Sequence, residues 1–265
     1  GDYNADGSID LFVIPGPFFQ TGQPSSNGEL PYIIFNDGSG VLNYMDRVEL
    51  TGVVPVSPIW GWDAAHFNVE AGKLPGFAGD SIVLGTSVPG FATRLLQPSG
   101  TGSKAEWQAI APVDISGTNP LNAYEVQIED VNGDGINELL ITTFTTLHLF
   151  ATPDGSTFSE DVTINSQSGM IFTVVEIADM DNDGQKDLIY CSTSCVIIYG
   201  PTPSSTPGTF NAVSEWQSGQ QSALFDLTAA GTLAFTMQVA DFDDNGFNDV
   251  VMSVSSSIRT AFYFT

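Results

Sequence analysis

Short runs of β-branched, aromatic and other hydrophobic residues recur along the whole chain, separated by clusters of Gly, Asp, Asn and Ser. The runs Tyr124–Ile128, Phe172–Ile177 and Phe235–Val239 alternate in part between apolar and polar positions. Such alternation is typical of strands with one buried face, and turn residues at both ends keep each strand short. The pattern predicts an all-β fold of many short strands.

One stretch shows how these strands are grouped. Between residues 139 and 179 we predict four in succession: Leu139–Phe144, Thr146–Ala151, Phe158–Ile164 and Phe172–Ala178. Four strands per repeat, with turns between them, are typical of a propeller blade. We therefore predict one β-propeller domain over residues 1–265, made of four-stranded antiparallel blades with repeats at about 1–58, 59–120, 121–168, 169–230 and 231–265. Because roughly eighteen strands make about four and a half blades, we expect either a larger parent ring, for example of about seven blades, or a partner that supplies the missing strands.

Two short segments share the sequence Glu-Trp-Gln, at residues 106–108 and 215–217. We place both on equivalent outer strands of their repeats. A Trp repeated at one position of a blade favours packing between blades over a platform for a ligand.

A nine-residue loop of one design occurs four times, and a hydrophobic run follows each copy. Every copy has Asp, Asn or Glu at positions 1, 3, 5 and 9 and Gly at position 6. Ca²⁺ takes about six to eight oxygen ligands, which alternate residues of one short loop can supply, with the backbone carbonyl of position 7 as a further ligand. The loops therefore predict about four Ca²⁺ sites, with these residues at positions 1, 3, 5, 7 and 9: Asp2, Asn4, Asp6, Ser8 and Asp10; Asp130, Asn132, Asp134, Ile136 and Glu138; Asp179, Asp181, Asp183, Gln185 and Asp187; Asp241, Asp243, Asn245, Phe247 and Asp249.

The alternative is that these loops are ordinary turns, since Asp, Asn and Gly dominate turns for reasons unrelated to metal. Four copies in the same phase favour metal, because clustered carboxylates repel one another unless a cation offsets them. A degenerate fifth copy covers residues 66–80, with His66 in place of the first Asp and Asp80 as the closing acid. We do not expect it to hold metal.

The chain has 31 Asp and Glu against 6 Lys and Arg, a formal net charge of -25. This charge disfavours nucleic acid and anionic membrane surfaces as partners. The sequence has no apolar run of about 18 residues, so we expect no direct membrane insertion. Cys191 and Cys195 lie between two strand-like runs, where either a disulfide across a hairpin or a pair of free thiols is open.

The four D-x-[DN]-x-[DN]-G-x-x-[DE] loops and the strands after them resemble the FG-GAP/VCBS repeat family over essentially the whole chain, and the turn Asn36–Gly40 resembles its VCBS branch. This family contains calcium-binding β-propellers, including those of integrin alpha-subunit heads. The resemblance implies calcium loops between the first and second strands of each blade, and an extracellular, secreted or cell-surface location.

Catalytic signatures are missing from the sequence: it has no G-x-S-x-G, H-E-x-x-H or Walker motif, and His148 is most simply a strand residue. We therefore expect a non-enzymatic adhesion or recognition module for protein or glycan ligands, stabilised by calcium. The alternatives are a structural subunit of an extracellular assembly of its own copies, and a propeller that processes polysaccharides.

Overall fold

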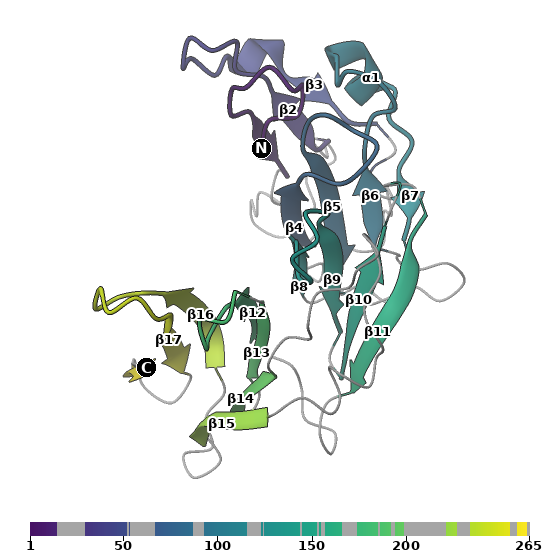
Figure 1. Cartoon of the computed structure of the whole chain (residues 1–265). Coiled ribbons are helices and arrows are strands. Elements are labelled where there is room, and N and C mark those ends of the chain that lie inside the picture. Colours follow the sequence, from purple (N-terminus) through teal and green to yellow (C-terminus); the bar gives the residue numbers. More distant parts are fainter. Residues whose placement is uncertain are drawn as a thin grey trace, which may run out of the picture. The chain divides into compact units, whose positions relative to one another are not determined.

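The structure is a computed structural model. It describes residues 1–14, 30–51, 53, 67–86, 93–115, 123, 125–143, 145–152, 154, 157–165, 174–184, 186–191, 194–198, 221–226, 234–254 and 259–263. These residues form five small β-sheets, and in each sheet the strands lie in chain order (Figure 1). The predicted all-β fold is confirmed.

The first sheet contains β1 (Leu11–Val13), β2 (Tyr32–Ile34) and β3 (Val48–Glu49). The second contains β4 (Phe67–Gly72), β5 (Ser81–Thr86), β6 (Arg94–Leu96) and β7 (Val113–Asp114). The third contains β8 (Glu125–Glu129), β9 (Glu138–Thr142), β10 (Thr146–Ala151) and β11 (Ser159–Asn165). The fourth contains β12 (Val174–Ala178), β13 (Asp187–Cys191), β14 (Ser194–Ile198) and β15 (Gln221–Asp226), and the fifth contains β16 (Ala234–Ala240), β17 (Asp249–Val254) and β18 (Arg259–Tyr263).

Burial follows the position of each strand in its sheet. Strand β8 alternates, with Val126 and Ile128 buried and the residues beside them half-buried, whereas every residue of β9 and of β13 is buried. An inner strand that is covered on both faces reads as a continuous apolar run, which explains Leu139-Leu140-Ile141 after the second loop. In β10, Leu147 and Leu149 are buried and His148 between them is half-buried, as its strand assignment predicts.

The contacts divide the chain into two compact units, 1–128 with 154–156, and 129–153 with 157–265. In the first unit, Trp107 is fully buried in a core that includes Ile33, Leu50 and Ile82. In the second unit, Leu140 and Leu149 of the third sheet pack with Leu188 of the fourth. Each unit therefore has a hydrophobic core of its own.

The prediction of an outer strand at residues 106–108 is wrong, because these residues belong to the short helix α1 (Lys104–Gln108). Ser103 caps this helix: its hydroxyl accepts from the Glu106 N–H, and the Glu106 carboxylate accepts from the Ser103 N–H. This capping box satisfies amide groups that a helix leaves unpaired at its start. The Trp107 indole N–H donates to the Tyr3 carbonyl at 2.8 Å, so this Trp is a core residue. The matching segment at 215–217 lies outside the described residues.

The strand register places Cys191 directly opposite Cys195, and Cys191 is disulfide-bonded. Only one helix other than α1 occurs among the described residues, the 3₁₀ turn η1 (Tyr44–Asp46). In that part of the chain no helix is long and apolar enough to span a membrane.

Candidate metal centres

The four acidic loops occupy equivalent places. Three of them join the first strand of a sheet to the second: residues 130–138 between β8 and β9, 179–187 between β12 and β13, and 241–249 between β16 and β17. The first loop, residues 2–10, leads directly into β1. Strand ends therefore hold both ends of the last three loops and the C-terminal end of the first.

The loops also share one hydrogen-bond frame. The carboxylate at position 1 accepts from the backbone N–H of positions 5 and 6, and the side-chain oxygen at position 3 accepts from position 5. The N–H of position 6 lies 3.0, 2.9, 2.9 and 2.8 Å from the position 1 oxygen in chain order. Carboxylates that accept several N–H groups are held in fixed directions. The frame therefore orients the same side chains in every copy.

Backbone conformation at two positions makes this frame possible. Gly at position 6 has φ of +87°, +87°, +88° and +91°, a region open to glycine at little cost. Position 4 has a positive φ as well, at Ala5 (57°), Gly133 (72°), Asn182 (62°) and Asp244 (59°). Among the residues that are not glycine, Asn182 and Asp244 belong to types that tolerate this region, whereas Ala5 costs about 1 to 2 kcal/mol of conformational energy. The sequence reasoning missed position 4, because its residues share no chemistry.

The closing acid at position 9 is buried in all four loops. Asp10, Glu138, Asp187 and Asp249 are at most 4% exposed. In each loop, one of its oxygens accepts from the backbone N–H of position 2, at 2.7 to 2.9 Å. A buried carboxylate needs such partners or a cation, since desolvation alone disfavours its charge.

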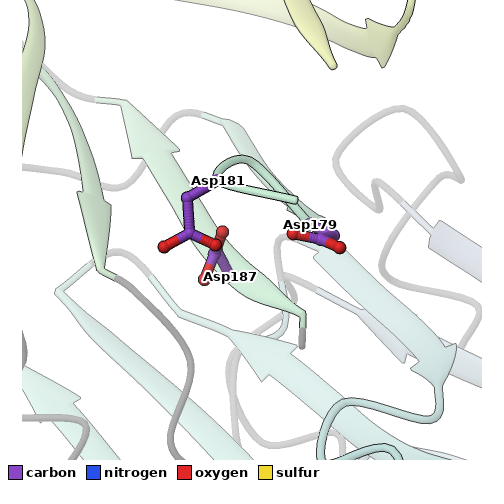
Figure 2. A group of neighbouring side chains, drawn as sticks. All are labelled: Asp179, Asp181 and Asp187. Carbon is purple, nitrogen blue, oxygen red and sulfur yellow. The ribbon is translucent and has the colours of Figure 1, made fainter. Parts of the chain in front are cut away.

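In two loops the acids converge. Carboxylate oxygens of Asp179, Asp181 and Asp187 all lie within 4.8 Å of one another, and Figure 2 shows the three side chains gathered at one loop. Asp241, Asp243 and Asp249 form the same group in the last loop. Three carboxylates at this separation repel one another, and a divalent cation would offset that repulsion.

In the other two loops an amide stands at position 3. The Asn4 side-chain N–H donates to Asp6 at 2.8 Å, and the Asn132 side-chain N–H donates to Glu138 at 3.2 Å. The oxygen of each amide accepts from the position 5 N–H. These loops thus reduce the repulsion by internal donors, while each amide still contributes an oxygen of the kind that Ca²⁺ takes.

The pKa values reflect this crowding. Burial, together with the charges of Asp134 and Asp130, raises the pKa of Glu138 to about 8. Burial also raises the pKa of Asp10 and that of Asp181, where the charges of Asp183 and Asp179 add to the effect. By contrast, the Asn4 side-chain donor lowers the pKa of the exposed Asp6 carboxyl. The buried and crowded acids therefore carry their charge at a cost, which is the condition that favours binding of a cation.

The remaining predicted ligands are placed as follows. The Asp183 N–H donates to the carboxylates of Asp179 and Asp181, and Asn245 accepts from the Phe247 N–H at 2.8 Å. At position 7, the N–H groups of Ser8 and Ile136 donate to the acid at position 5. Gln185 lies outside the described residues. The oxygen-rich donor set fits Ca²⁺, which needs several carboxylates and carbonyls rather than nitrogen or sulfur ligands.

The interpretation of residues 66–80 as a degenerate loop with His66 at its start is corrected by the strand positions. Residues 67–72 form β4, so the turn that corresponds to the calcium loops begins at Lys73, and His66 lies outside the described residues. Asp80 serves a different purpose, because its carboxylate accepts from the Asp2 N–H at 2.8 Å and its own N–H donates to the Asp2 carbonyl at 2.7 Å. This turn therefore supports the first acidic loop.

Residues 130–190 match the FG-GAP-like repeat family. The matched segment contains the second and third acidic loops with β9 to β13, and it supports the FG-GAP resemblance for this part of the chain. No curated protein matches the chain.

Among solved structures, a lectin of Agrocybe aegerita described as specifically recognising non-reducing terminal N-acetylglucosamine is similar in fold, with a TM-score of 0.57 at 14% identity. The likeness covers 95% of this chain and 59% of the lectin chain, so this chain spans less than two thirds of that protein. A Photorhabdus luminescens Tc holotoxin pore structure also matches, at 16% identity, over 89% of this chain and 13% of the other, with a TM-score of 0.39.

Proposed function

We propose that this chain is a calcium-stabilised recognition module, built as a β-propeller, that binds glycans outside the cell and has no catalytic role. The observation that carries the calcium part is the convergence of Asp179, Asp181 and Asp187, repeated at Asp241, Asp243 and Asp249. The observation that supports glycan recognition is the fold likeness to a lectin over 95% of this chain.

The propeller proposal is supported by the repeated unit. Successive sheets have strands in simple chain order, and an acidic loop recurs at the same corner of three of them. Such repetition of small antiparallel sheets is typical of blades, which pack side by side and protect their edges. The position of Leu188 in one core with Leu140 and Leu149 is the kind of packing that neighbouring blades make.

Calcium would supply charge compensation. The acids at positions 1, 3, 5 and 9 would hold it, and the buried position 9 carboxylate would link the ion to the inner strand that follows. An ion that binds only the folded chain stabilises it by RT ln(1 + [L]/Kd), about 2.7 kcal/mol per site at a hundredfold excess over Kd. The ions are therefore proposed as structural supports, and the ligand is proposed to bind elsewhere on the loops.

The extracellular location is supported by the disulfide at Cys191, since disulfides persist mainly in oxidising compartments. A non-enzymatic role is supported by the sequence, which has no catalytic motif, and by the hydrogen-bond frame, which already uses the carboxylates of the acidic loops.

A glycan array tests this function, with the protein applied once in 2 mM calcium and once in excess chelator. Binding to a defined glycan group in calcium, lost in chelator together with a large fall in melting temperature, is the expected result. A protein that is folded and calcium-loaded yet binds no glycan would refute recognition of glycans while leaving the calcium sites intact. Unchanged melting in chelator would refute the calcium proposal.

One observation favours a second function, assembly with copies of itself. In the first and fifth sheets, β1 and β18 each have one pairing strand among the described residues. An outer strand of this kind can accept a strand from another chain. Light scattering over a hundredfold range of concentration distinguishes the two, because assembly predicts a mass that rises with concentration.

A further inference from the structure

Two neighbouring acidic loops in the second unit are joined by a single side chain. The Asn248 side-chain N–H donates to the backbone carbonyl of Asp179 at 2.8 Å, although the two residues are 69 positions apart in sequence. Asn248 is position 8 of the last loop, and Asp179 is position 1 of the loop before it. The strands that precede these loops, β16 and β12, contact each other, so the link sits between two packed elements.

Each end of this hydrogen bond lies at or next to a group of converging acids. Asp179 is one of the three clustered acids of its loop, and its two carboxylate oxygens accept from the N–H groups of Asp183 and Gly184. Asn248 directly precedes Asp249, the fully buried acid that closes the other cluster and accepts from the Phe242 N–H. A change that orders Asp249 therefore restrains its neighbour Asn248, and through it the main chain at Asp179.

The same relation recurs one loop earlier. Lys186, position 8 of the loop 179–187, lies with its Nζ 3.0 Å from Glu129, the residue just before Asp130. Both of these side chains are about two fifths exposed, and ion pairs of this kind contribute little because water screens them. Asn248 is half-buried and donates to a main-chain carbonyl, so water weakens its hydrogen bond less than it weakens the ion pair of Lys186.

We propose that Asn248 is a positioning residue that couples the calcium sites of residues 179–187 and 241–249, so that occupancy of one raises the affinity of the other. This inference rests on the proposed calcium function. When calcium binds at one loop, it fixes the position of the donor or the acceptor of the shared hydrogen bond. The second loop is then already partly ordered, so it loses less conformational entropy when it binds its own calcium ion. Coupling between sites is reciprocal, so each site raises the affinity of the other by one factor, which we expect to be about fivefold.

Hydrogen exchange followed by mass spectrometry measures each loop separately, because peptides that cover residues 174–191 and 234–254 report their own calcium midpoints. In the otherwise unchanged protein, Asp243→Asn weakens the last loop, and we expect the midpoint of peptide 174–191 to rise about fivefold. Asp181→Asn weakens the other loop and should raise the midpoint of peptide 234–254 by the same factor.

The decisive comparison repeats these measurements with Asn248→Ala and with Asn248→Asp, which keeps the size of the side chain but removes its donor. Both replacements should abolish the reciprocal shifts while each loop still gains protection in calcium. Lys186→Ala is the matched control, since it removes the exposed contact between loops, and we expect it to leave the coupling between the last two loops unchanged.

The proposal is overturned if the midpoints shift equally with and without the Asn248 donor, if they never shift, or if only one of the two directions shows a shift. An absence of calcium-dependent protection in both peptides would overturn the calcium function itself. That result is distinct from a failure of coupling alone, in which both loops remain protected by calcium.

Discussion

The substitution Asp187→Asn should have opposite effects on stability with and without calcium. Asp187 is 1% exposed and accepts from the Met180 N–H at 2.7 Å, a bond that the carbonyl of Asn can also accept. The replacement has nearly the same size, so packing changes little and the charge is the main variable. In the chelated protein it removes one of three carboxylates whose oxygens lie within 4.8 Å.

The magnitude follows from that separation. Two unit charges at this distance repel by about 1 kcal/mol in water and by about 3 kcal/mol at an effective dielectric constant of 20. Because Asp181 is exposed and Asp187 is buried, relief of about 1 to 3 kcal/mol is expected in chelator. In calcium the variant keeps this relief but lacks the contribution of the site, about 4.1 kcal/mol at a thousandfold excess over Kd, so its net loss is about 1 to 3 kcal/mol. For a chain of this size, about 1 kcal/mol shifts the melting temperature by roughly 2 to 4 °C.

Calorimetry in 2 mM calcium and in excess chelator measures the change in melting temperature of the variant under both conditions. The variant should melt several degrees above the unchanged protein in chelator and several degrees below it in calcium. Asp114→Asn provides the control, because this exposed carboxylate lies outside the loops and pairs only with Arg94 among the contacts described; its effect should be small in both conditions. A shift of Asp187→Asn with the same sign in both conditions would refute the argument that this cluster binds a cation.

Three further predictions concern the frame and the core. Glu138, whose pKa rises from 4.5 to about 8 on folding, gives the chelated protein stability that is fully present below about pH 4.5 and is lost as the pH rises through 8. Glu138→Gln should reduce this loss of stability. If the melting temperatures of the two proteins change equally with pH between about 5 and 8.5, the prediction is contradicted. Gly246 has φ +91° and open space around its missing Cβ, so Gly246→Ala should cost about 1 kcal/mol through backbone strain alone, and Gly246→Asn less. If urea titrations give the same loss in free energy of unfolding for Gly246→Ala and Gly246→Asn, backbone strain is not the cause of that loss. Trp107→Phe keeps an aromatic ring but leaves the Tyr3 carbonyl without its 2.8 Å donor, a loss of about 1 to 3 kcal/mol, whereas Trp107→Ala should cost about 3 to 5 kcal/mol. A Phe variant as stable as the unchanged protein by urea titration would show that this hydrogen bond contributes nothing.

Two parts of the fold differ from what the sequence predicts, for physical reasons. The repeated Glu-Trp-Gln at residues 106–108 favours a strand, yet Ser103 and Glu106 have the spacing of a capping box, a signal that predicts the start of a helix. The fifth turn begins at Lys73 and not at His66, and it ends at an acid that resembles the closing acids of the other loops in sequence, Asp80. Its carboxylate contacts Asp2, which is 78 residues away, and no local pattern indicates such a contact.

The sequence by itself determined the short strands and the acidic loops, because both depend on residues close together in the chain. The alternation of apolar and polar residues predicts the strands. Each nine-residue loop contains every donor and acceptor of its hydrogen-bond frame, including the position 1 carboxylate and the Gly at position 6 that donates to it with a positive φ. Only the tertiary structure decided which acids are buried, how far their pKa values move and which loops contact each other. Burial depends on the strands that cover a residue, and the bond from Asn248 to Asp179 exists because packing brings two distant loops together, which local sequence does not encode.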